Sequence, residues 1–258
     1  MLQEERFIRI RALLTTYTRI STERIARDLQ VSRETARRDI LDLETLGALR
    51  RVHGGAVALG PEPEPPMSVR SRAHPGEKRR IAKAAIQLLQ PGQTLFLDAG
   101  TTTSVLAEEL STLSGLTVVT NSMAIALRLA ASNAGRDAGH AVVLLGGEVD
   151  AQTHAVHGDI TIGEIGRYNA DVAMMSPVGI DAAHGATSFE RRECEVARAM
   201  SRHAQRVVIL ADYSKVGQVS RVSYAAAADI HDVVTDSRAR TLPGFKELKR
   251  AGCRMIVG

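Results

Sequence analysis

The sequence predicts an α/β protein in two domains, a small N-terminal domain of helices with a β-hairpin and a larger C-terminal domain built on a mostly parallel sheet. Three observations predict this fold class. Apolar residues recur at helical spacing before residue 59, prolines cluster between residues 59 and 75, and short apolar runs alternate with helical patterns beyond them. The predicted domains are therefore residues 3–58 and 76–258, joined by a linker over residues 59–75.

The bulk composition is ordinary for a water-soluble globular chain, with 44% hydrophobic and 24% charged residues. No apolar run is long enough to cross a bilayer, and the charged segment Met1–Arg6 lacks the apolar core of a signal peptide. Cys194 and Cys253 form neither a metal-type nor a redox-type spacing. We therefore expect a cytoplasmic protein.

Three helices and a hairpin are predicted before the linker. Residues 3–18 carry a helical apolar stripe of Phe7, Ile10, Leu14 and Tyr17. Ser21 is expected to cap a second helix that buries Ile25, Ala26 and Leu29, and Ser32 a third that buries Ala36, Ile40, Leu43 and Leu46. Gly47 stands where a left-handed cap would end this helix. Residues 49–52 and 56–58 flank His53-Gly54-Gly55 as a small hairpin.

This domain carries most of the positive charge. Residues 1–59 hold 11 arginines, no lysine and 8 acidic residues, a net charge of 11 − 8 = +3 out of +4 for the whole chain. Two short helices, a tight turn and a glycine-tipped hairpin are typical of a winged helix-turn-helix, whose second helix enters the major groove of DNA. The guanidinium group of arginine forms paired hydrogen bonds with phosphates and with the edges of guanine bases. The candidate DNA-binding residues are Ser32, Arg33, Thr35, Arg37, Arg38, Arg51 and His53.

Two other interpretations of the first quarter of the chain stay open. The basic face can be a solvated surface of a plain helical domain, and the prolines can form a ligand for an adaptor domain instead of a linker. A general single-strand binder is disfavoured, because the chain is only 3% aromatic and has no tryptophan for base stacking.

Strands and helices alternate after the linker, and fully apolar strands predict a sheet covered on both faces. The predicted helices are residues 77–89, 102–113, 123–131, 160–168, 192–204 and 244–250. The predicted strands are residues 94–97, 116–119, 142–145, 172–175, 207–210, 233–235 and 255–257.

An anion site is predicted where the strand at 94–97 runs into a helix. Asp98-Ala99-Gly100-Thr101-Thr102-Thr103 offers a close backbone approach and free N–H groups at the helix start, which suit phosphate. The alternative is an ordinary capped turn. Polar residues also follow other strands, and strand ends of a parallel sheet share one ligand-binding edge. The candidate effector-binding residues are Asp98, Gly100, Thr101, Thr102, Thr103, Asn121, Gly147, Gly179, Asp181, Asp212 and Lys215.

The segment Val31–Ile40, followed by Leu43-Glu44, Gly47 and Arg51–Ala56, resembles the DNA-binding domain of the DeoR family of bacterial transcriptional regulators. Residues after the linker extend the resemblance: Glu77-Lys78, Asp98–Thr103, Thr120-Asn121, Gly146-Gly147, Gly158, Gly179-Ile180, Gly185, Glu193, Arg198, Asp212, Lys215 and Asp236. The sequence departs from the family pattern at Ala36, at Ser176-Pro177-Val178 and at Ala197.

The resemblance implies a homo-oligomeric repressor of sugar or polyol genes that a phosphorylated sugar releases from a double-stranded DNA operator. It also implies an effector domain similar in fold to ribose-5-phosphate isomerase. An isomerase-like enzyme is the alternative, with Asp98, Asp181 and Glu193 as available carboxylates. We expect a regulator, since isomerisation has no use for the N-terminal domain. No cofactor is expected, and no metal, because His154 and His157 lack further ligands in the sequence.

Overall fold

The computed structural model describes residues 2–17, 19–58, 65–133 and 139–258. The chain divides into two units, residues 1–73 and 74–258. Each unit has its own hydrophobic core.

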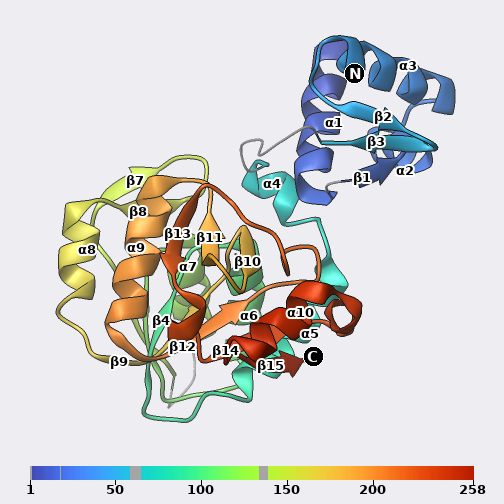
Figure 1. Ribbon diagram of the computed structural model, residues 1–258. Helices are drawn as coiled ribbons and strands as arrows, with labels where there is room; N and C mark the ends of the chain where they lie inside the picture. The colour runs from blue at the N-terminus through green and yellow to red at the C-terminus, as the bar shows by residue number, and fades with distance from the viewer. Residues whose placement is uncertain (1, 18, 59–64, 134–138) are drawn as a thin grey trace. The chain divides into compact units, whose positions relative to one another are not determined.

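The N-terminal unit combines helices with a small antiparallel sheet (Figure 1). Its helices are α1 (Gln3–Tyr17), α2 (Thr22–Leu29), α3 (Arg33–Thr45) and the short α4 (Met67–Arg70). Its strands are β1 (Arg19–Ser21), β2 (Arg50–Val52) and β3 (Gly55–Val57), which pair in the order β1-β3-β2. This is the arrangement of a winged helix-turn-helix, as the sequence predicts.

The helix ends are set by the residues that the sequence singles out. Ser21 accepts a hydrogen bond from the backbone N–H of Arg24, and Ser32 accepts one from the N–H of Thr35. Each serine therefore satisfies a donor that the first turn of a helix leaves unpaired. Gly47 follows α3 with a φ of +67°, a left-handed backbone conformation that favours glycine and ends the helix.

The hairpin β2–β3 turns at His53-Gly54, with Val52 opposite Gly55. The sequence analysis did not predict β1, which extends this hairpin to three strands by pairing Ile20 with Ala56. Gly55 allows this pairing, because a Cβ at that position would overlap the carbonyl group of Ile20.

Residues 59–64 of the predicted linker lie outside the described residues. Further along the predicted linker, α4 is helical, where the prolines around it had predicted an extended chain. Pro65 and Pro66 come before the helix, where the missing proline N–H removes no helical hydrogen bond. The Nε of Arg70, the last residue of α4, donates a hydrogen bond to the carbonyl of Pro65 at 2.8 Å. This bond links the two ends of the helical turn.

The C-terminal unit contains a parallel sheet with the strand order β15-β14-β12-β9-β4-β5-β6. These strands are β4 (Thr94–Leu97), β5 (Thr117–Thr120), β6 (Ala141–Leu144), β9 (Ala170–Met175), β12 (Ala204–Leu210), β14 (Asp232–Thr235) and β15 (Arg254–Val257). The helices of this unit are α5 (Pro75–Ile86), α6 (Thr101–Leu110), α7 (Met123–Ser132), α8 (Asp159–Ile165), α9 (Arg191–Arg202) and α10 (Pro243–Arg250), with 3-10 turns η1 (Ala227–Asp229) and η2 (Ser237–Thr241).

Both faces of this sheet are buried, which explains why its strands are continuously apolar. In β4, Phe96 packs into the cluster that holds side chains from α8, α9 and α10, whereas Leu95 and Leu97 join the cluster with α5, α6 and α7. The seven predicted strands and six predicted helices of this unit are all present, with their ends displaced by a few residues.

Two smaller antiparallel sheets were not predicted. One pairs β7 (Glu148–Asp150) with β8 (Ala155–His157), and the other has the order β10-β11-β13. The strands of the second sheet are β10 (Gly179–Asp181), β11 (Gly185–Ser188) and β13 (Val222–Ala225). These strands have three or four residues each and are rich in glycine, alanine and serine, so they lack the β-branched runs that predict strands.

Candidate DNA-binding and effector sites

The face of α3 that carries Arg33, Arg37 and Arg38 is exposed to solvent. The opposite face buries Ala36, Asp39, Ile40 and Leu43 in the core of the unit. Helical periodicity separates the two faces, so packing against α1 and α2 leaves the arginines on the surface. At the start of α3, the hydroxyls of Ser32 and Thr35 lie 2.8 Å apart and bond to each other.

The arginines of α3 make only weak intramolecular ion pairs. Arg33 lies 3.8 Å from Glu23 and Arg37 lies 3.9 Å from Glu34, and both arginine side chains are 71% exposed. Arg38 makes no ion pair with any described residue. Exposed pairs of this kind contribute about 0–1 kcal/mol, so a phosphate or a guanine edge can displace the glutamates at little cost.

Arg51 and His53 lie on the hairpin, and both are exposed. Glu44 of α3 holds the hairpin through two contacts with Arg51. Its Oε1 accepts a hydrogen bond from the backbone N–H of Arg51 at 2.8 Å, and its Oε2 lies 3.6 Å from the Arg51 Nε. One carboxylate thus joins the helix to the hairpin. The sequence did not predict this role for Glu44. An acidic residue at the C-terminal end of an arginine-rich helix forms no pattern that indicates a contact with the hairpin.

A second cluster lies at the carboxyl ends of β4 and β9. The chain runs from β4 outward to β5 and β6 and then returns to β9 on the other side of β4. Such a reversal of strand order opens the crevice where ligands bind to parallel sheets. Asp98, Gly100 and Asn121 meet here, because the N–H of Ala99 donates to the Asp98 Oδ1 at 2.8 Å and to the Asn121 Oδ1 at 2.9 Å.

The helix α6 starts at these strand ends, and Gly100 supplies no side chain to cap it. The N–H groups of the first helical turn are those that a helix leaves free for an anion. The side chains of Thr101, Thr102 and Thr103 are buried, and Thr103 donates from its hydroxyl back to the Gly100 carbonyl at 3.0 Å. Backbone groups of this turn, more than threonine hydroxyls, are therefore the donors that the turn could offer to an anion.

Lys215 reaches the same strand ends from the loop after β12. Its Nζ lies 3.2 Å from the Ser176 Oγ and also donates to the Pro177 carbonyl. Ser176 follows β9 and neighbours Gly100, since a Cβ built on Gly100 would lie 3.6 Å from the Ser176 Cβ. Ser176 therefore joins the cluster, although the sequence analysis noted it only as a departure from a family pattern.

Four other predicted residues have different surroundings. Asp212 is 2% exposed and accepts from the N–H of Ser214 at 3.0 Å, so it shapes the loop that carries Lys215. Gly147 packs against α8, where a Cβ would overlap the hydroxyl of Thr161. Gly179 and Asp181 were expected in a loop at a strand end, but they lie in β10, and Asp181 accepts from the N–H of His184 at 2.7 Å.

Tyr224 of β13 is a further residue beside this cluster. Its hydroxyl is buried and has no hydrogen-bond partner in the described part of the chain. Burial raises the pKa of Tyr224 well above its ordinary value, and the negative charge of Asp98 raises it further. The sequence analysis missed Tyr224 because β13 itself was not predicted.

Within the described residues, no group of three or more His, Cys, Asp or Glu side chains is arranged to hold a metal ion. None of the described helices is both long enough and apolar enough to span a membrane.

Comparison with known families decides the identity of both units. Residues 6–62 match the DeoR-like helix-turn-helix domain, and residues 73–237 match the DeoR C terminal sensor domain. The chain belongs to the DeoR family. This DeoR-family protein is a DNA-binding transcriptional regulator with a sensor domain, which agrees with the exposed arginine face of α3.

Curated relatives align along almost the whole length of this DeoR-family chain. It is 35% identical to the HTH-type transcriptional repressor GlcR of Bacillus subtilis (strain 168) over 243 residues, covering 92% of this chain and 89% of the relative. It is 33% identical to the HTH-type transcriptional regulator GolR of Listeria innocua, covering 96% of each. It is 29% identical to the Glycerol-3-phosphate regulon repressor of Escherichia coli (strain K12), covering 92% of each.

Among solved structures, this DeoR-family chain is similar to ribose 5-phosphate isomerase A from Methanocaldococcus jannaschii. The identity is 16% and the TM-score is 0.38, with 54% of this chain and 52% of the isomerase covered.

Proposed function

We propose that this protein represses genes of sugar or polyol metabolism by binding an operator through α3 and the hairpin β2–β3. The observation that carries the proposal is the exposed face of α3, on which Arg33 and Arg37 make only weak ion pairs and Arg38 makes none with any described residue. Arg37 and Arg38 are the residues to which we assign most base contacts, because they lie one turn into a helix whose N-terminus Ser32 fixes. Arg51 and His53 would reach the backbone or the minor groove.

We further propose that a phosphorylated sugar-type molecule binds at the carboxyl ends of β4 and β9 and weakens operator binding. The first turn of α6 and the ammonium of Lys215 provide donors for a phosphate, and Asp98 provides an acceptor for a hydroxyl group. The relative in Escherichia coli is named for glycerol 3-phosphate, which has this chemistry. Its name supports the proposal for this chain but does not identify the effector.

A homo-oligomer in the cytoplasm completes this proposal. One helix-turn-helix reads only a few base pairs, whereas two copies on a symmetric operator give usable affinity and specificity. The sensor domain is expected to bind its ligand without transforming it, since the relatives over the full length are named as transcriptional regulators.

The test begins with selection of bound sequences from a pool of random DNA duplexes, using the purified protein. The selected duplex then serves in fluorescence-anisotropy titrations of Arg37→Ala and Arg38→Ala. A bidentate arginine–guanine contact contributes about 1–3 kcal/mol, so each variant should bind the operator about 10- to 100-fold more weakly. Arg191→Ala is the matched control, because this arginine lies in the sensor domain and its side chain is 85% exposed.

Wild-type affinity of both α3 variants would refute the assignment of these arginines. A selection that enriches no sequence, with or without sugar phosphates in the buffer, would refute the proposed function itself.

A further inference from the structure

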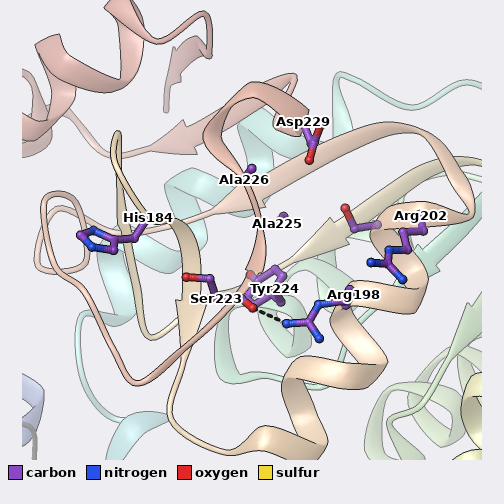
Figure 2. A pocket seen from close by; sticks show the side chains of 9 residues that line it. His184, Arg198, Arg202, Ser223, Tyr224, Ala225, Ala226 and Asp229 are labelled. Carbon is purple, nitrogen blue, oxygen red and sulfur yellow. Dashed lines mark hydrogen bonds between the residues drawn. The ribbon is translucent and has the colours of Figure 1, made fainter.

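A pocket of about 290 Å³ opens in the C-terminal unit between the second half of α9 and the strand β13 (Figure 2). It lies at the C-terminal part of α9, whereas the proposed effector site lies at the N-terminus of α6. Its lining is His184, Arg198, Ser201, Arg202, Ser223, Tyr224, Ala225, Ala226 and Asp229. The volume is close to the lower end of the range for small-molecule sites.

Arg198 is held in place at the wall of this pocket. Its Nη2 donates to the carbonyl of Ser223 at 2.6 Å, drawn as the dashed line in Figure 2, and its Nη1 donates to the Glu195 Oε1 at 3.0 Å. A guanidinium has five N–H donors, so these two bonds fix its plane and leave further donors for a ligand. An arginine that is already ordered loses little conformational entropy when it binds.

Arg202 lies four residues further along α9, and residues at this spacing share one face of a helix. It is exposed, and it forms no ion pair with any described residue. The hydroxyls of Ser201 and Ser223 make no hydrogen bonds within the described ranges either, so the pocket offers several uncommitted donors.

The uncommitted donors of the lining favour an anion more than its net charge does. Two arginines and Asp229 give 2 − 1 = +1, and Glu195, which pairs with Arg198 from outside the lining, brings the sum to zero. The carbonyl end of α9 acts against an anion, but it carries only about half a negative charge. Arg198 and Arg202 provide forked donors, the geometry that binds phosphate and carboxylate groups best. Asp229, at the edge of the pocket, is an acceptor for a hydroxyl group of the same ligand (Figure 2).

We propose that this pocket is a second ligand site of the sensor domain, which binds a small metabolite through a phosphate or carboxylate group. Tyr224 lines this pocket and also lies near Asp98, but the anion-binding groups differ: Arg198 and Arg202 here, and the first turn of α6 with Lys215 at the strand ends.

The first experiment locates the anion on the full-length protein by chemical modification of arginine. Phenylglyoxal modifies the protein in chloride, phosphate or acetate at equal ionic strength, and mass spectrometry of peptides gives the rate at each arginine. We expect phosphate or acetate to slow modification of Arg202 at least threefold, with no change at Arg191 of the same helix. Protection by phosphate alone identifies a phosphate site, and protection by both anions identifies a general oxyanion site. Equal rates at Arg202 in all three salts would overturn the proposal.

The second experiment is calorimetric titration of inorganic phosphate into variants. Arg202→Gln removes an exposed arginine without an ion pair, so the fold should persist, and we expect phosphate to bind at least tenfold more weakly at this site. Arg167→Gln is the control with the same charge change, because Arg167 is exposed and forms no ion pair within the described residues. Both variants are also made in the Lys215→Ala background, which weakens the proposed effector site. Phosphate affinity that falls with Lys215→Ala but does not change with Arg202→Gln would mean that the anion binds at the carboxyl ends of β4 and β9. The pocket assignment would then be wrong.

Discussion

At the scale of single residues, the run Arg37-Arg38-Asp39 combines two roles in three neighbouring positions. Arg37 and Arg38 face solvent, whereas the Asp39 side chain is 2% exposed and accepts two bonds from Arg6, at 2.6 Å from Nε and 2.9 Å from Nη2. The carboxylate of Asp39 raises the pKa of Arg6 above its ordinary value. This buried pair ties α1 to the helix that we propose reads DNA.

Removal of Asp39 should therefore destabilise the N-terminal unit. Breaking a buried pair and leaving its partner charged costs about 3 kcal/mol, and urea denaturation followed by circular dichroism should show this loss for Asp39→Ala. Asp42→Ala is the control, because Asp42 makes an exposed bond of 3.0 Å to Gln3, and its loss should cost less than about 1 kcal/mol. Equal losses for the two variants would mean that the Arg6–Asp39 pair contributes little.

We expect His74 to make the stability of the sensor domain depend on pH. Burial lowers the pKa of His74 below its ordinary value of 6.5. The folded protein thus keeps His74 neutral at a pH where the unfolded chain binds a proton, so stability falls as the pH drops through this value. His74→Asn keeps a residue that tolerates the left-handed backbone here, with a φ of 51°. Between about pH 7.5 and pH 5.5, the wild type should lose more stability in urea titrations than this variant. Parallel losses would exclude His74 as the cause.

At the scale of secondary-structure elements, the position of the hairpin depends on one side chain of α3. The hairpin itself is short, and a two-stranded ribbon is only marginally stable alone. Glu44 accepts from the backbone of Arg51, and β1 adds a third strand on the other side. We therefore expect operator binding to depend on residues that need not contact DNA.

A pair of variants isolates this positioning role. Glu44→Ala and Glu44→Gln remove the same negative charge, but only glutamine keeps an oxygen that can accept from the N–H of Arg51. A hydrogen bond of this kind is worth about 1 kcal/mol, so Glu44→Ala should bind the operator about fivefold more weakly than Glu44→Gln in anisotropy titrations. Equal affinities of the two variants would show that Glu44 does not hold the hairpin in place.

At the scale of the whole molecule, the order of the strands decides where distant residues meet. Asp98 and Lys215 are more than one hundred positions apart in the chain, yet both come to the carboxyl ends of the strands around the point where β9 returns beside β4. If a ligand binds there and α3 binds DNA, as we propose, the two events must affect each other by the same free energy in both directions.

The effector hypothesis is testable on the intact chain. A thermal-shift screen of sugar phosphates and polyol phosphates should find a ligand that raises the melting temperature, because a ligand that binds the folded state stabilises it. That ligand should release the wild type from its operator. The variant Lys215→Ala, which removes the ammonium group at the strand ends, should bind the operator normally and resist release. Normal release of this variant would place the effector elsewhere.

Much of the fold was predictable because its signals are local. Capping serines, the left-handed Gly47 and the helical apolar stripes mark the helix-turn-helix, and continuous apolar runs mark the strands of a sheet buried on both faces. The sheet β10-β11-β13 was not predictable in this way. Its short strands are held by pairing between residues far apart in the sequence, such as Thr187 with Ser223.

The sequence by itself determined that this protein carries an arginine-rich helix for DNA and an α/β domain with polar strand ends, since both follow from periodicity and residue chemistry along neighbouring positions. Only the tertiary structure decided which polar residues meet: it brought Ser176 to Lys215, placed Gly179 and Asp181 in a separate sheet, and built the pocket of Arg198 and Arg202 against β13. The physical reason is that such meetings depend on strand order and on long-range pairing, which no local pattern of residues encodes.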